Sequence, residues 1–319
     1  MAGTNWFTGS IRAMTVIILL LSLSFSADVE LAYAQGDSSL KTQFESKLSE
    51  FIGVPVSVDD YRLEYTTVRL SGIRIGDRKK PELPNGRIEE LSATCDFMSL
   101  LGGQLILTDI SLATTTLSLT RNEKGSFLPL KSRKTGNEGA EKTFADLPFV
   151  NLSGQSILIK ISDHGSRRFF DLKLPEIKLS HGKGTNQLGV SFSASVETGV
   201  AGKKADANSY FSGKLDLTGT LSQPVVNGIA SIDRLKIENR VLKQPVNLNR
   251  GKFKIVANRL STEDLRGSWG HSQVSISAQL ENFDNFDFSL SFKADPIILE
   301  DFSQAFVNER GVTFSGRGS

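Results

Sequence analysis

Apolar residues occupy every second position in run after run of this chain, from about residue 54 onward. The clearest runs extend from Leu188 to Val196, from Val274 to Leu280 and from Phe286 to Phe292. Glycine, proline, asparagine or aspartate stands between the runs. A period of two places all the apolar side chains of a strand on one face of a sheet. The sequence therefore predicts a mainly β protein whose sheet has one apolar face and one polar face.

The expected strands fall into two blocks. The first block contains candidate strands at 54–58, 61–75, 87–97, 105–108 and 115–121. The second block contains candidate strands at 150–162, 168–179, 188–197, 209–221, 225–237, 251–257, 274–280 and 286–293. Long strands joined by short turns are typical of an antiparallel meander.

Two short helices are expected beside the strands. Residues 38–52 carry apolar residues at spacings of three and four, and Gly53 ends the pattern. Residues 297–306 carry apolar residues at a spacing of four after an aspartate–proline pair that suits the start of a helix.

The N-terminus predicts an export signal or a membrane anchor. The apolar stretch from Met14 to Phe25 follows Arg12 and is shorter than the roughly 20 residues of a membrane span. Ala32-Tyr33-Ala34 offers a small-x-small cleavage site. Both a cleaved signal and an uncleaved anchor would send the rest of the chain across a membrane.

These patterns divide the chain into four segments. Residues 1–35 are the signal peptide or anchor, and 36–130 are the first helix and strand block. Segment 131–147 begins with lysine, glutamate, glycine and serine or threonine without an apolar pattern, which predicts a linker or long loop. Residues 148–319 are the strand repeats, and the start of another strand near the last residue suggests a truncated sequence.

Composition excludes several classes of function. The net charge of +2 arises from 37 basic and 35 acidic residues spread along the chain, unlike the clustered basic surface of a nucleic-acid-binding protein. Cys95 is the one cysteine, so no internal disulfide forms, and its strand-like surroundings predict a small buried hydrophobe.

No constellation of catalytic or metal-binding residues is visible. His164, His181 and His271 have glycines nearby and no cluster of ligands at metal spacing, which predicts turn residues. Neither a Gly-x-Ser-x-Gly elbow nor a phosphate loop occurs. We therefore expect no enzyme activity, no metal and no cofactor.

The apolar strand face has two interpretations. A closed sandwich or barrel would pack it into a dry core, and periodicity alone favours this interpretation. A long curved sheet would instead keep the face open as a groove for an acyl chain. The length of the strands and the scarcity of packing helices favour the groove.

The order of several motifs resembles that of AsmA-family proteins and their TamB relatives, over most of residues 14–319. A hydrophobic segment, a short helix ending at a Gly-x-x-Val-like turn, and a strand block come first. Strands with a Leu-Leu-Gly-Gly-like bend, an Arg-Asn-x-x-Gly end and a Gly-x-Leu unit before proline follow. The matching segments are 51–56, 68–75, 87–112, 117–125, 211–224 and 295–302.

The resemblance implies a curved, groove-like sheet in a cell-envelope protein of a double-membraned bacterium. Such a protein is held at the inner membrane and faces the periplasm, or lies in the periplasm after signal cleavage. Its implied partners are phospholipid acyl chains, the inner membrane and outer-membrane assembly proteins. The implied function is phospholipid transport or outer-membrane biogenesis, without catalysis.

The residues with the cleanest alternation are the candidates for the groove lining. They are Leu188, Val190, Phe192, Val274, Ile276, Leu280, Phe286, Phe288, Leu290 and Phe292. The alternative function is an exported β-sandwich that packs its apolar face internally and binds glycan or protein through its loops. An envelope hydrolase is a third hypothesis, which the missing set of acid, base and nucleophile disfavours.

Overall fold

The computed structural model shows a chain built almost entirely of β-strands. It describes residues 41–42, 45–46, 49, 54–77, 79, 83–98, 107–121, 143–147, 149–163, 165, 167–182, 184–200, 205–220, 224–237, 245–270, 272–282 and 287–294. Segment 1–35 and the candidate helix at 297–306 lie outside these residues, so both stay predictions. Within the described ranges, no helix has the length and apolar character needed to cross a bilayer.

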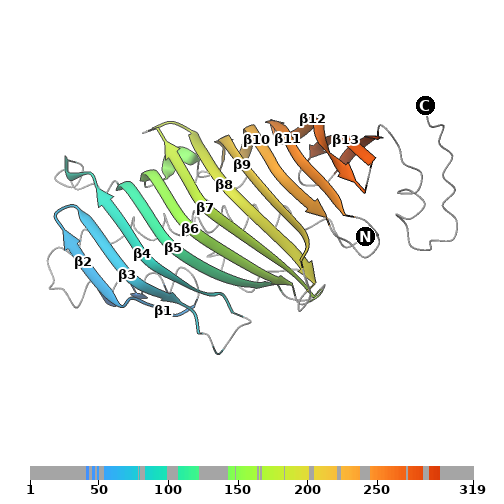
Figure 1. The fold of residues 1–319 in the computed structure, drawn as a ribbon. Helices are drawn as coiled ribbons and strands as arrows, with labels where there is room; N and C mark the ends of the chain where they lie inside the picture. Colours follow the sequence, from blue (N-terminus) through green and yellow to red (C-terminus); the bar gives the residue numbers. More distant parts are fainter. Residues whose placement is uncertain are drawn as a thin grey trace.

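The described strands form one sheet of 14 strands in which neighbours in the chain pair almost throughout (Figure 1). The sheet order runs from β1 through β3 to β14, and β2 also pairs with β3. The strands are β1 Val56–Ser57, β2 Asp60–Glu64, β3 Thr67–Ile75, β4 Asn85–Cys95, β5 Leu107–Arg121, β6 Phe149–Asp163, β7 Arg168–His181, β8 Gln187–Val200, β9 Ala205–Gly219, β10 Pro224–Ile237, β11 Val246–Val256, β12 Arg259–Trp269, β13 Ser272–Asn282 and β14 Asp287–Ala294. The predicted mainly β meander is confirmed.

One pair of strands departs from the antiparallel pattern. β5 and β6 run parallel, with Leu107 opposite Phe149 and Leu119 opposite Ile161. A parallel neighbour requires the chain to return to the same end of the sheet before the second strand begins. The predicted linker at 131–147 therefore coincides with a crossover, and the two strand blocks adjoin in a single sheet.

A row of residues with positive φ angles crosses the first half of the sheet. Gly72 of β3, Thr114 of β5 and Ser156 of β6 have φ angles of +62°, +44° and +53°. Across this row the apolar positions advance by three residues instead of two, as from Leu70 to Ile73. The pairing register is the same on both sides of the row, so no strand gains an extra residue there.

The same row explains one error in the predicted strand bounds. The sequence predicts separate strands at 105–108 and 115–121, whereas β5 is one strand across both. At Thr114 the apolar residues change from even-numbered to odd-numbered positions. In a sequence, such a change looks the same as the end of one strand and the start of another.

Two other predicted strands need correction. The candidate strand at 61–75 is two strands, β2 and β3, joined by a turn in which Tyr65 has a φ of +50°. β12 is missing from the prediction because its register shifts between Thr262 and Leu265 and because Gly267 takes one of its apolar positions.

The N-terminal helix is confirmed at each position of 38–52 that the structure describes. Those positions are Lys41, Thr42, Glu45, Ser46 and Ser49. The Glu45 carboxylate accepts a hydrogen bond from the Val58 amide at 2.8 Å, and the Ser49 hydroxyl accepts one from the Val56 amide at 2.8 Å. These bonds fix the helix to the first strand of the sheet.

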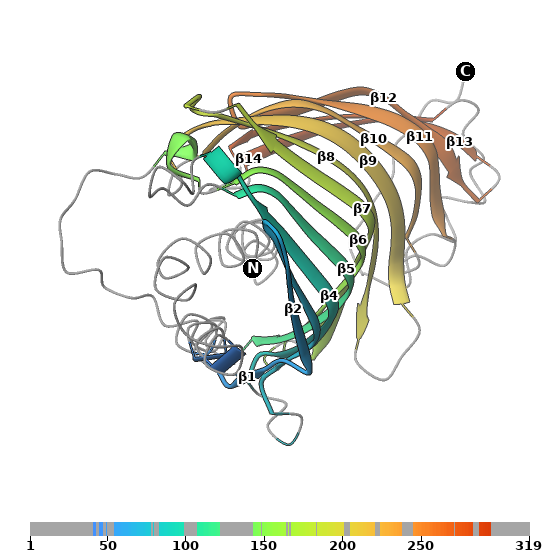
Figure 2. The ribbon, with the colours of Figure 1, turned by 90° about the vertical axis from the view of Figure 1, so that its left-hand side faces the viewer.

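The sheet is strongly curved (Figure 2). A short 3-10 helix on its concave side, η1 (Phe144–Asp146), contributes Phe144 to the largest buried cluster, so the apolar face of the sheet is the concave one. This helix packs against the apolar face near β8. Phe144 is 1% exposed and belongs to the same core cluster as residues of β3 to β8. The end of the predicted linker therefore contributes to the core.

Candidate functional site: the concave apolar face

The apolar face continues from each strand to the next, as the pairing of opposite residues shows. Directly opposite residues of paired strands lie on the same face. One such row contains Leu70, Leu91, Leu112, Gly154, Ile177, Phe192, Gly213, Ala230 and Phe253. The face that the alternation predicts is therefore a single surface that spans strands far apart in the sequence.

The three predicted lining residues of β8 lie on this face but differ in exposure. Leu188 is 5% exposed and Val190 is 9% exposed, and both belong to the largest core cluster. Phe192 is partly exposed and packs against two core clusters. The structure thus places the first two residues in the core and the third at its margin.

The predicted residues of β13 and β14 lie at the other end of the sheet. Val274 is 3% exposed in a small core cluster, and Ile276 packs against that cluster from a partly exposed position. The register places Phe292 opposite Ile276, Leu290 opposite Ala278 and Phe288 opposite Leu280. Phe286 lies outside the described residues.

The burial of the apolar face is uneven. Two clusters of fully buried residues cover the strands from β1 to β8, and a third covers parts of β11, β12 and β13. Among the described residues of β9 and β10, no hydrophobic side chain is fully buried. Buried apolar side chains therefore occur on β1, on β3 to β8 and on β11 to β13, whereas the apolar side chains described on β9 and β10 are at least partly exposed.

We call the apolar-face residues of β9 and β10 the open stretch. They are partly exposed and lie opposite one another or opposite core residues, and four of them, Phe211, Leu215, Leu217 and Leu235, pack against the buried clusters. Their members are Phe211, Leu215, Leu217, Val226, Ile232 and Leu235. The sequence predicts both strands but does not single out these residues, because Ser209, Gly213 and Gly228 interrupt the apolar alternation.

The open stretch begins at an aromatic contact. The rings of Phe192 and Phe211 meet edge to face, with centroids 6.2 Å apart. A Cβ atom at Gly213 would lie 3.0 Å from the Phe192 ring, so this glycine makes room for the ring. The Phe192 ring therefore occupies the space that a side chain at Gly213 would need.

Buried polar groups lie within the apolar face. His181 is 6% exposed at the end of β7, opposite Leu188, and neither ring nitrogen has a hydrogen-bond partner. The prediction of a turn residue was wrong, because His181 is the last residue of a strand and faces the core. His164 and His271 lie outside the described residues.

The lone cysteine behaves as the sequence predicts. Cys95 is buried, and burial raises the pKa of its thiol. The raised pKa keeps the thiol protonated at neutral pH, whereas a nucleophile or metal ligand needs the thiolate. No group of three or more potential metal ligands occurs among the described side chains.

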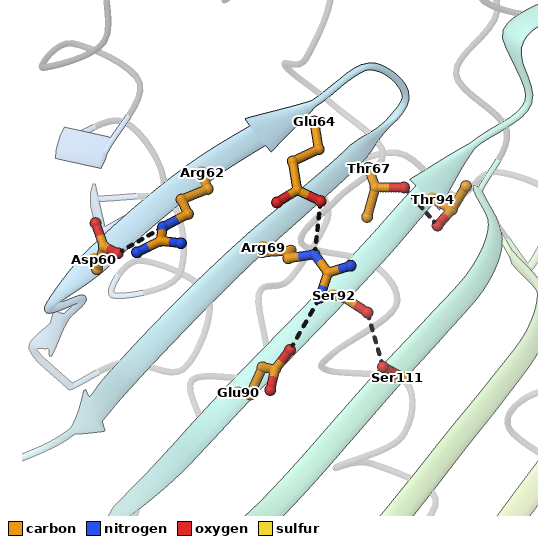
Figure 3. A network of polar contacts seen from close by, with 9 residues as sticks. All are labelled: Asp60, Arg62, Glu64, Thr67, Arg69, Glu90, Ser92, Thr94 and Ser111. Carbon is orange, nitrogen blue, oxygen red and sulfur yellow. Dashed lines mark hydrogen bonds and ion pairs between the residues drawn. The ribbon is translucent and has the colours of Figure 1, made fainter.

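Charged and hydroxyl side chains pair on the convex face of β2 to β5 (Figure 3). Arg69 forms ion pairs with Glu64 at 3.1 Å and with Glu90 at 3.6 Å across three neighbouring strands. Hydroxyl pairs add to the same face, with 2.8 Å between the Ser92 and Ser111 oxygens. Farther along the sheet this face also exposes apolar side chains, those of Tyr210, Ile229 and Val256. The candidate site is the concave face, because the apolar side chains continue there from strand to strand.

The geometry therefore offers an apolar binding surface without a reactive group. Its distinguishing feature is the open stretch, which lies between clusters of buried residues. A comparison with protein-family models finds none that matches this chain, and a comparison with curated proteins finds no match.

Proposed function

We propose that the protein is a non-enzymatic carrier that holds phospholipid acyl chains against the open stretch. The observation that supports this function is the uneven burial: the apolar side chains described on β9 and β10 are all at least partly exposed, while β8 and β11 also carry buried ones. Burying a methylene group stabilises a complex by about 0.8 kcal/mol. An acyl chain laid along these side chains would therefore bind without any polar contact.

The cellular setting forms part of the same proposal. The resemblance of motif order to AsmA-family proteins and the export signal or anchor in segment 1–35 support an envelope protein. It would be held at the inner membrane facing the periplasm, or released into the periplasm after cleavage. There it would support phospholipid transport or outer-membrane biogenesis.

The alternative, an exported β-sandwich, requires a second sheet that faces the first. The described residues form one sheet, so they do not supply that second layer. The partly exposed side chains of the open stretch instead favour binding of a separate molecule over packing against another part of the chain.

Binding of a phospholipid with a fluorescent acyl chain tests the proposal. Phe211→Glu and Leu215→Glu place a charge in the open stretch and should weaken binding by at least about tenfold, because each charge must lose its hydration when the chain binds. Tyr210→Glu is the matched control, since Tyr210 neighbours Phe211 on the convex face and is 44% exposed.

A second variant separates loss of binding from loss of folding. Ala230→Trp fills the open stretch with an apolar side chain and should also weaken binding, while circular dichroism and the urea midpoint report whether the sheet is intact. The proposal fails if the unsubstituted chain binds no phospholipid. It also fails if Tyr210→Glu weakens binding as much as Phe211→Glu.

A further inference from the structure

The two ends of the described sheet carry different edge strands. At one end, β2 is five residues long, and Asp60, Arg62 and Glu64 are exposed. Short, charged edge strands resist pairing with another chain. At the other end, β14 is eight residues long, and charges stand only near its ends, at Asp287 and Lys293. Among the described strands, β14 therefore lacks the short length and the dense charge of β2.

The sequence of β14 has an internal symmetry. From Asp287 to Lys293 it reads Asp-Phe-Ser-Leu-Ser-Phe-Lys, which is the same in both directions about Leu290 except that an acid stands at one end and a base at the other. An antiparallel pair of two such strands, centred on Leu290, would match every residue with a suitable partner.

We propose that β14 pairs antiparallel with β14 of a second copy of this chain, forming a two-fold symmetric dimer. The axis passes through Leu290, which lies opposite Leu290 of the second copy. Phe288 then lies opposite Phe292, Ser289 opposite Ser291, and Asp287 opposite Lys293. A two-fold axis produces each pairing twice, which is the form of a self-complementary interface.

Other registers lose this complementarity. A shift by one residue places apolar positions opposite serines, because the side-chain period is two. A shift by two residues removes both pairings of Asp287 with Lys293. Opposite-charge and aromatic cross-strand pairs each stabilise a sheet by roughly 0.2–1 kcal/mol. The centred register alone combines both kinds of pair.

The dimer would extend the concave apolar face. Leu290 and Phe292 lie opposite Ala278 and Ile276 of β13, on the apolar face. Directly opposite residues in the centred register share a face, so this face would continue from one copy to the other on the same side. The dimer rests on the symmetry of β14 and does not depend on lipid binding.

Disulfide trapping of the full chain tests the register. In Leu290→Cys the two introduced cysteines have Cα atoms about 4.5–5.5 Å apart, within the range of a disulfide. In Ser289→Cys they are about 8 Å apart, which is too far. We expect a disulfide-linked dimer for Leu290→Cys and at least about tenfold less for Ser289→Cys alone. A mixture of Ser289→Cys and Ser291→Cys chains should restore the crosslink.

Charge reversal tests the same interface without cysteines. Lys293→Asp places like charges together at both ends and should raise the dissociation constant of the dimer by about tenfold or more, measured by analytical ultracentrifugation. Asp287→Lys combined with Lys293→Asp should return it to within about threefold of the unsubstituted value. A merely structural effect of Lys293 would not be rescued in this way.

Two results would overturn the proposal. One is a monomeric chain at tens of micromolar, which would mean that another segment or partner covers β14. The other is crosslinking of Ser289→Cys alone as efficient as that of Leu290→Cys, which would show a different register.

Discussion

The ring of Phe192 in β8 stands edge-on to the ring of Phe211 in β9, with an angle of 78° between their planes. Both rings are partly exposed, and both pack against the cluster of buried residues that includes Leu172 and Ala194. Phe192 also packs against the larger cluster, so the contact joins the buried part of the apolar face to the open stretch.

The first prediction concerns the energy of this aromatic contact. Edge-to-face pairs contribute about 0.5–1.5 kcal/mol beyond the burial of their area. A double-mutant cycle of Phe192→Ala and Phe211→Ala, measured by urea unfolding, should give a coupling in this range. Tyr210→Ala combined with Phe192→Ala is the control and should show no coupling, because Tyr210 lies on the convex face. A coupling near zero for the phenylalanine pair would contradict the prediction.

The second prediction concerns η1. Phe144 is among the largest fully buried side chains of the described residues, although its neighbours in the sequence suggested a loop. Phe144→Ala should lower the free energy of unfolding by about 3–5 kcal/mol, because truncating a buried aromatic ring removes its contacts and leaves a cavity. Ala145, which is exposed, offers the control: Ala145→Ser should change stability by less than about 0.5 kcal/mol. A loss below about 1 kcal/mol for Phe144→Ala would show that η1 is not part of the core.

The third prediction concerns the positive φ angle at Gly72. Its φ of +62° disfavours any side chain, and an added Cβ would collide with the Asp59 side chain. Gly72→Ala should therefore destabilise the sheet by about 2–3 kcal/mol, from backbone strain and from displacement of Asp59, which pairs with Arg74. Gly184→Ala should cost only about 1 kcal/mol, since Gly184 has a φ of +74° and open space around it. Asp59→Ala removes the carboxylate but keeps the Cβ atom, which would lie 2.8 Å from the added methyl group, so it should lower the cost of Gly72→Ala only in part. Urea unfolding measures all three.

The fourth prediction concerns the pH dependence of stability at Asp171. Partial burial raises the pKa of Asp171, and Lys160 opposes that effect. Because the folded pKa exceeds the unfolded value, the contribution of this group is full below about pH 3.9 and is lost as pH rises through the folded pKa. Asp171→Asn imitates the protonated form, so it should stabilise the protein at pH 7 by less than about 1 kcal/mol. At pH 3 the unfolding free energies of the two proteins should agree, and an equal gain at both pH values would refute the assignment.

The predicted strand bounds are accurate where apolar and polar residues alternate without interruption. The candidate strands at 168–179, 188–197 and 225–237 lie within three residues of β7, β8 and β10 at each end. Period-two alternation is a local property, so it can be read from one strand without its neighbours. The assignment of Leu188, Val190 and Val274 to one face follows in the same way.

Sequence reasoning failed where the apolar alternation is interrupted within a strand or where pairing is not local. The single strand β5 looked like two because of Thr114, and β12 was missed because of the shift between Thr262 and Leu265. The parallel pairing of β5 with β6 joins residues more than 40 positions apart. No local pattern encodes the direction of such a pairing, since both arrangements accept the same alternation.

The amino-acid sequence by itself determined that the chain forms a one-sided sheet and which residues share its apolar face, because these properties follow from the side-chain period of a strand. Only the tertiary structure decided how much of that face is covered. Coverage depends on the curvature of the sheet and on elements such as η1 that pack from a distant part of the chain. For this reason Val190 is buried while Leu215, opposite it on β9, stays partly exposed.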